Sequence, residues 1–240
     1  MKNEINIEIL RPSYWEVMDV IEILSHLKSI ADPSRLNHMK RYGINTKSSL
    51  GISIYDLRRY ACEIGRNHVL ALDLWKTGIH DARLLACFID DAEKITSDQM
   101  DLWADGFNSW DLCDQACTSL FDKSPLAWKK IPIWAESEKE FVKRAAFSLI
   151  AGLFIHDKES DDHRFEAFFP LIKKQAIDER NYVKKAVNWA LRNIGKRNLS
   201  LHKQAIICAK EIDEIDSKSA RWIAKDALRE LQSEKIIQRL

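Results

Sequence analysis

The sequence repeats itself in its C-terminal half, and this repetition restricts the fold more than any other feature. The segment FVKRAAFSLI, from Phe141, aligns with YVKKAVNWAL, from Tyr182, at an offset of 41 residues. The segment NYVKKAVNWALRN, from Asn181, aligns in turn with KSARWIAKDALRE, from Lys218, at an offset of 37 residues. Periods of this length, each holding a pair of helices, are typical of HEAT-like and armadillo-like arrays. Because one helix pair cannot bury its apolar face alone, the pairs must stack into a continuous core.

Helical periodicity extends through the rest of the chain. Apolar residues recur three and four positions apart, no segment alternates strictly, and only seven glycines and five prolines interrupt the pattern. The sequence therefore predicts an all-α fold: a right-handed HEAT-like or ARM-like helical repeat solenoid, C-shaped, with a concave groove. We expect a single domain over residues 1–240 with about six helix pairs, a helical cap in 1–30 and a C-terminal capping helix in 217–237. The predicted helices cover residues 14–29, 34–42, 53–64, 67–77, 80–90, 97–106, 109–121, 125–135, 138–154, 161–177, 180–196, 199–212 and 217–237.

The composition argues against a membrane protein and against a zinc site. No apolar run approaches the length needed to span a bilayer, and the N-terminus lacks the cationic start of a signal peptide, so we expect a cytoplasmic protein. The five cysteines include no C-x-x-C pair, and we expect reduced thiols rather than a zinc site. The acidic stretch HDKESDDH, from His156, is predicted to be a connecting loop and not a metal site. Nothing resembles a phosphate-binding glycine loop.

Charge is balanced overall but uneven along the chain. The formal net charge is +1, which divides into −4 for residues 1–137 and +5 for residues 138–240. Between Arg180 and Lys210 the chain has eight basic residues and no acidic residue. This segment could bind a polyanion; the alternative is an ordinary solvated helix face.

The helix predicted at 180–196 carries two opposed stripes. The apolar stripe consists of Val183, Val187, Ala190 and Ile194. The second stripe, on roughly the opposite side, consists of Lys185, Trp189, Arg192 and Lys196. Trp189 could cover a neighbouring repeat or make cation–π contacts with the basic residues. Alternatively, it offers a flat surface to a sugar or base, flanked by charges for phosphates. In the preceding repeat Arg144 matches Lys185, and a salt bridge to Glu140 is its simpler explanation.

A third feature is the segment Asn108-Ser109-Trp110-Asp111-Leu112-Cys113-Asp114. Ser109 is placed to cap a helix, and Trp110 and Asp114 are four residues apart, so they lie on one helix surface. Interaction with the helix dipole explains Asp111 well. It explains Asp114 less well, because Asp114 lies further into the helix and beside apolar residues.

These three features, in this order on a helical repeat frame, resemble the AlkD family of alkylpurine DNA glycosylases. The resemblance covers residues 40 to 200 and rests on Trp110 with Asp114, on Phe141 to Arg144, and on Lys185 to Arg192. It implies a concave face that holds duplex DNA and an enzyme that removes N3- or N7-alkylated purines, leaving the lesion in the base stack. Asp114 would match the catalytic carboxylate and Trp110 a tryptophan against the deoxyribose. Trp189 would match its partner, and Arg144 an arginine beside the phosphates.

The chemistry that the resemblance implies needs no metal, nucleotide or redox cofactor. An alkylated purine is cationic and leaves readily, and a carboxylate near C1′ can stabilise the positive charge left on the sugar. The expected partner is alkylated or structurally distorted duplex DNA, bound by a monomer through Arg144, Trp189, Lys185, Arg192 and Lys196. Two other functions remain open: a DNA-binding repeat protein without catalytic activity, and a protein-interaction scaffold.

Overall fold

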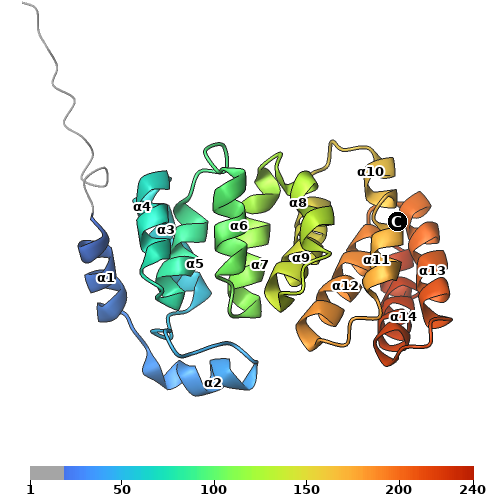
Figure 1. Cartoon of the computed structure of the whole chain (residues 1–240), viewed down its shortest axis with the longest axis horizontal. Coiled ribbons are helices and arrows are strands. Elements are labelled where there is room, and N and C mark those ends of the chain that lie inside the picture. The colour runs from blue at the N-terminus through green and yellow to red at the C-terminus, as the bar shows by residue number, and fades with distance from the viewer. Residues whose placement is uncertain (1–18) are drawn as a thin grey trace, which may run out of the picture.

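The helices stand side by side along the length of the molecule (Figure 1). The computed structural model describes residues 19–240, and within this range it contains helices, turns and loops but no strand. The all-α prediction is therefore confirmed. The chain begins in this range with α1 (Val20–Ser29) and α2 (Leu36–Arg41), which follows a short 3₁₀ turn at Pro33–Arg35.

The remaining long helices form two layers. Successive helices of the first layer pack on one another, in the order α3, α5, α7, α9, α12 and α14. Their bounds are α3 Ile54–Ile64, α5 His80–Ile89, α7 Trp110–Ser119, α9 Glu140–His156, α12 Asn181–Ile194 and α14 Lys218–Leu231. The second layer is α4 His68–Lys76, α6 Ser97–Asp105, α8 Ala127–Trp134, α11 Phe169–Gln175 and α13 Leu199–Asp213. Second-layer helices pack against the first, as α4 does on α5, α8 on α9 and α13 on α14.

One hydrophobic cluster runs through both layers, from Ile23 to Leu231. Its largest side chains come from the second layer and the connections, where Trp75 stacks on Trp103 with ring centres 4.2 Å apart. The central helix α9 is buried along most of its length, because α7, α8 and α12 all pack against it. None of the helices in residues 19–240 is both long and apolar enough to cross a membrane.

Polar caps fix several of the helix starts. The side chains of Ser53, Asn67, Asn198 and Ser217 accept hydrogen bonds from the first turns of α3, α4, α13 and α14. Ser109 precedes α7 as predicted, but its hydroxyl is buried and does not cap the helix. It donates instead to Asp111, which also pairs with His80 Nε2 at 2.9 Å. The hydrogen bonds from these two side chains outweigh burial and lower the pKa of Asp111.

Two of the predicted helices are each divided in the structure. The helix expected at 161–177 is α10 (Asp162–Glu166) followed by α11, because Pro170 lies in the first turn of α11 and cannot donate to a preceding turn. The helix expected at 217–237 ends at Leu231, and α15 (Glu234–Ile237) follows. Of the helix expected at 14–29, the residues before Asp19 lie outside the described part of the chain.

Candidate functional site

Trp110 and Asp114 occupy the first two turns of α7. Trp110 is the first residue of the helix and is half-buried. Its indole Nε1–H donates a 2.9 Å hydrogen bond to the carbonyl oxygen of Tyr42, which follows α2. The segment after α2 therefore lies against the start of α7, and it fixes the orientation of the Trp110 ring.

Asp114 forms a two-pronged ion pair with Arg144 on α9. Arg144 Nε donates to Asp114 Oδ1 at 2.9 Å, and Arg144 Nη2 donates to Oδ2 at 2.7 Å. The hydroxyl of Ser148, one helical turn further along α9, also donates to Oδ1 at 2.8 Å. The structure therefore brings two of the predicted site residues together, and Arg144 pairs with Asp114 rather than with Glu140.

Burial controls the electrostatics of this pair. The side chains are 14% exposed for Asp114 and 7% exposed for Arg144. Burial raises the pKa of Asp114, and the charge and hydrogen bonds of Arg144 counteract part of this rise. For Arg144, burial acts to lower the pKa, but the attraction of Asp114 outweighs it and the pKa is raised. The pair is poorly solvated, so each of its two groups depends on the other for stabilisation.

Tyr182, near the start of α12, links this pair to the N-terminal segment. Its carbonyl oxygen accepts a 2.7 Å hydrogen bond from Arg144 Nη1. Its hydroxyl donates to the carbonyl oxygen of Gly43 at 3.0 Å, across 139 residues of sequence. The close approach requires glycine, because Gly43 has a φ of +77° and a Cβ there would lie 2.2 Å from the Tyr182 hydroxyl.

We call the segment from α2 to Ile44 the strap. Its helix α2 lies across the end of the stack near α7 (Figure 1), and its carbonyl oxygens accept hydrogen bonds from Trp110 of α7 and Tyr182 of α12. The sequence does not point to Tyr182 or to the strap as functional, because both contacts use backbone carbonyl groups far away in the chain. In the sequence, Gly43 and Ile44 after a short helix predict only a turn, and not the contacts that this turn makes.

The four residues of the predicted basic stripe on α12 differ in their surroundings. Lys185 is exposed and Trp189 is half-buried. Arg192 Nη1 and Lys196 Nζ both pair with Glu230 on α14, the latter at 2.9 Å. Lys185 forms no ion pair with a carboxylate of residues 19–240, whereas the charges of Arg192 and Lys196 are shared with an acid that the sequence places 34 to 38 residues away.

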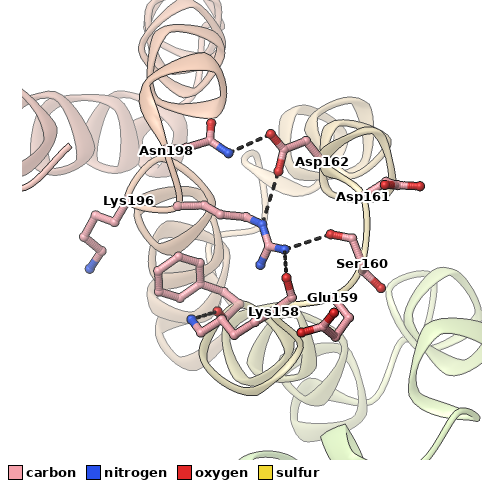
Figure 2. A pocket seen from close by; sticks show the side chains of 9 residues that line it. Lys158, Glu159, Ser160, Asp161, Asp162, Lys196 and Asn198 are labelled. Atoms are coloured by element: carbon pink, nitrogen blue, oxygen red, sulfur yellow. Dashed lines mark hydrogen bonds and ion pairs between the residues drawn. The ribbon is translucent and has the colours of Figure 1, made fainter.

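The acidic stretch from His156 to His163 ends α9 and begins α10, and residues 157–161 between them form a loop. Figure 2 shows Asp162 and Ser160 of this stretch facing Asn198 and the end of α12. Asn198 Nδ2 donates to Asp162 at 2.6 Å, and Arg197 Nη2 donates to the Ser160 carbonyl oxygen at 2.8 Å. These hydrogen bonds attach the acidic stretch to the residues that follow α12. In the described part of the chain, no cluster of three or more His, Cys, Asp or Glu side chains is arranged to hold a metal ion.

The chain is similar to several known proteins. The profile of a family described as DNA alkylation repair enzyme matches residues 23–231. An uncharacterized protein of Listeria innocua is 22% identical over 195 residues, which cover 80% of this chain and 85% of that protein. An uncharacterized protein of Listeria monocytogenes is 21% identical over the same shares of the two chains.

A solved structure has the same fold. It superposes with a TM-score of 0.75 at 21% sequence identity, over 89% of this chain and 95% of the other. That protein is described as one of a new family related to the HEAT-like repeat DNA glycosylases, with affinity for branched DNA structures. The predicted HEAT-like repeat architecture is confirmed by this match.

Proposed function

The chain belongs to the DNA alkylation repair enzyme family, and we propose that it is a DNA glycosylase that removes N3- or N7-alkylated purines from duplex DNA. The observation that carries the proposal is the poorly solvated carboxylate of Asp114, which lies one helical turn from the half-buried ring of Trp110. Arg144 and Ser148 hold the carboxylate in a fixed orientation, as a catalytic group requires.

The carboxylate retains capacity for one further interaction. A carboxylate has about four lone-pair sites, two on each oxygen. Oδ1 accepts from Arg144 Nε and Ser148, whereas Oδ2 accepts only from Arg144 Nη2. We propose that the second lone pair of Oδ2 interacts with the substrate. It would face either C1′ of the sugar or the attacking water.

The reaction then proceeds by departure of the base. The bond from C1′ to the purine nitrogen breaks, and its electron pair goes to the base, which neutralises the positive charge of the alkylated ring. The sugar is left with positive charge that Asp114 stabilises in a site of low dielectric. Water adds to C1′, its proton passes to solvent, and the DNA retains a site without a base.

Binding is assigned to the first layer, whose helices we propose to form the concave face of a C-shaped solenoid. Trp110 and Trp189 would contact the sugar and the electron-poor purine, because tryptophan faces attract cationic groups. Lys185, Arg192 and Lys196 would contact phosphates. Arg192 and Lys196 would first have to break their ion pairs with Glu230. We propose that the protein binds as a monomer and needs no cofactor.

A second candidate is a protein that binds DNA without releasing bases. It is favoured by the same ion pair, since Arg144 neutralises the charge that the glycosylase mechanism needs. The affinity of the structurally similar protein for branched DNA also points this way.

One experiment separates the two functions. The protein is incubated with methylated duplex DNA, released bases are separated by chromatography, and binding is followed in parallel. We expect release of 3-methyladenine or 7-methylguanine by the wild type, lost in Asp114→Asn with binding retained. Asp98→Asn, an exposed change on α6, is the matched control and retains release. Binding without release by the wild type would overturn the glycosylase and support the second candidate.

A further inference from the structure

A groove runs lengthwise along α5, separate from the contact between Asp114 and Arg144. Helices α3 and α7 both pack on α5 and stand on either side of it. Each of the three helices contributes residues one turn apart, and such residues share a helix face. We call this the α5 groove; it is lined by Ile54 and Arg58 of α3, Leu84 and Phe88 of α5, and Gln115 and Ser119 of α7.

The groove consists of two neighbouring cavities. The first, of about 360 Å³, lies beneath the strap and is largely apolar, with aromatic groups from His38, Tyr42 and Trp110. The second, of about 640 Å³, lies towards the C-terminal ends of the same helices. Between them Arg58 Nη2 donates to Gln115 Oε1 at 2.9 Å, so one hydrogen bond spans the groove from wall to wall.

The second cavity is strongly cationic. Arg58, Arg66 and Lys123 are among its lining residues, none of which is acidic. Arg58 and Lys123 form no ion pair with a carboxylate of residues 19–240, and Arg66 has only a distant one, 3.8 Å from Asp91. In the part of the chain that the structure describes, these cations therefore remain available to an anion.

The shape of the groove selects for a single strand. Packed helix axes lie about 8–10 Å apart, so α3 and α7 stand within about 20 Å of each other, and their side chains fill much of that width. Along α3, the eight helical steps from Ile54 to Cys62 cover about 12 Å, which is the length of about three nucleotides in one stacked strand. A duplex is too wide to reach the floor of α5.

We infer that the α5 groove binds an unpaired DNA strand, with bases against the aromatic cavity and phosphates against Arg58 and Lys123. The choice of DNA as the ligand rests on the proposed function. Aromatic surfaces that alternate with unpaired cations are the features that bind single strands without sequence preference. An acidic peptide would use the cations but not the flat surfaces of Tyr42 and Phe88.

Cys62 provides a direct test, because it lines the groove and is the one exposed thiol among the five cysteines. The rate of its reaction with a maleimide is measured on the full chain, alone and with a single-stranded thymidine oligomer. We expect the oligomer to slow the reaction by about tenfold. A glutamate-rich peptide of equal charge reaches only the cations, so it should slow the reaction less than the oligomer does; equal protection by this peptide would overturn the assignment to DNA.

Binding measurements supply the second arm. A forked duplex with an unpaired arm should bind more tightly than a blunt duplex of the same paired sequence. In Arg58→Glu with Lys123→Glu, we expect this preference to fall by about tenfold, whereas the exposed change Lys203→Glu on α13 preserves it. Equal affinities for the two DNAs in the wild type would overturn the inference. Protection of Cys62 without base release from methylated DNA would instead contradict the glycosylase and leave the groove assignment standing.

Discussion

The guanidinium of Arg144 donates two parallel hydrogen bonds to the carboxylate of Asp114, 2.9 Å from Nε to Oδ1 and 2.7 Å from Nη2 to Oδ2. This pair joins α7 to α9 at the centre of the first layer. Because water reaches little of either side chain, the pair contributes to the fold as well as to the proposed site. Its two roles can be measured separately.

Arg144→Met should lower the free energy of unfolding by about 3–5 kcal/mol, because it leaves the charge of Asp114 buried without a partner. Urea denaturation measures this change. The double variant Arg144→Met with Asp114→Leu should recover most of the loss, since both charges are then absent. A single variant as stable as the wild type would show that water or another cation solvates Asp114.

Glu230→Gln should strengthen DNA binding, because it releases Arg192 and Lys196 from their shared carboxylate. Two more phosphate contacts would steepen the dependence of log affinity on log salt by about one to two units. The exposed change Glu214→Gln removes the same charge from the end of α13 and is the matched control. An equal effect of both variants would mean that only net charge matters.

Asp122 should make the protein less stable as pH rises. Its side chain is fully buried against α9, and burial raises its pKa from the usual 3.8 to about 6, although His156 Nδ1 lies 2.6 Å from Oδ2. The folded state therefore holds a proton that the unfolded state has lost. The contribution of this proton is present at low pH and disappears between about pH 4 and pH 6, a change of about 3 kcal/mol.

The measurement compares urea denaturation of the wild type and Asp122→Asn across this range. The difference between the two proteins should shift in favour of the variant as pH rises. Asp157→Asn is the control, and its pH dependence should have the opposite sign. Burial acts to raise the pKa of Asp157, but hydrogen bonds from Ser160 prevail and lower it. A pH-independent difference for Asp122→Asn would show that the carboxyl is already solvated.

Tyr182→Phe should loosen the strap without disturbing the two layers. The change removes only the hydroxyl that donates to Gly43 at 3.0 Å, which typically contributes about 1 kcal/mol. Hydrogen exchange of the amides from Tyr42 to Thr46 should become faster. Tyr55→Phe, on an exposed side chain of α3, should leave this exchange unchanged; unaltered exchange in Tyr182→Phe would mean that other contacts hold the strap.

Sequence periodicity predicted the helices well, because each amphipathic stripe is local. The positions of Val183, Val187 and Ile194 identified the buried face of α12, and the structure buries all three. The divided helix at 161–177 was missed because its apolar spacing continues across the break, although Pro170 marks the place.

The partners of the site residues could not be predicted in the same way. Arg144 and Asp114 are 30 residues apart, and Arg192 and Glu230 are 38 apart. Which charges meet depends on how far neighbouring helices are rotated and shifted when they stack. A single sequence shows the stripe on each helix but not this offset. The sequence therefore did not predict that Glu230 neutralises part of the charge of the basic stripe.

The strap changes how a stack of repeats should come apart. In a simple array each repeat contacts only its neighbours, and the ends can fray one repeat at a time. Here the bonds of Tyr42 to Trp110 and of Gly43 to Tyr182 connect the first helices directly to ones far along the stack. Loss of an end therefore removes contacts from the middle, and the part between α2 and α12 should melt as one cooperative unit rather than unravel.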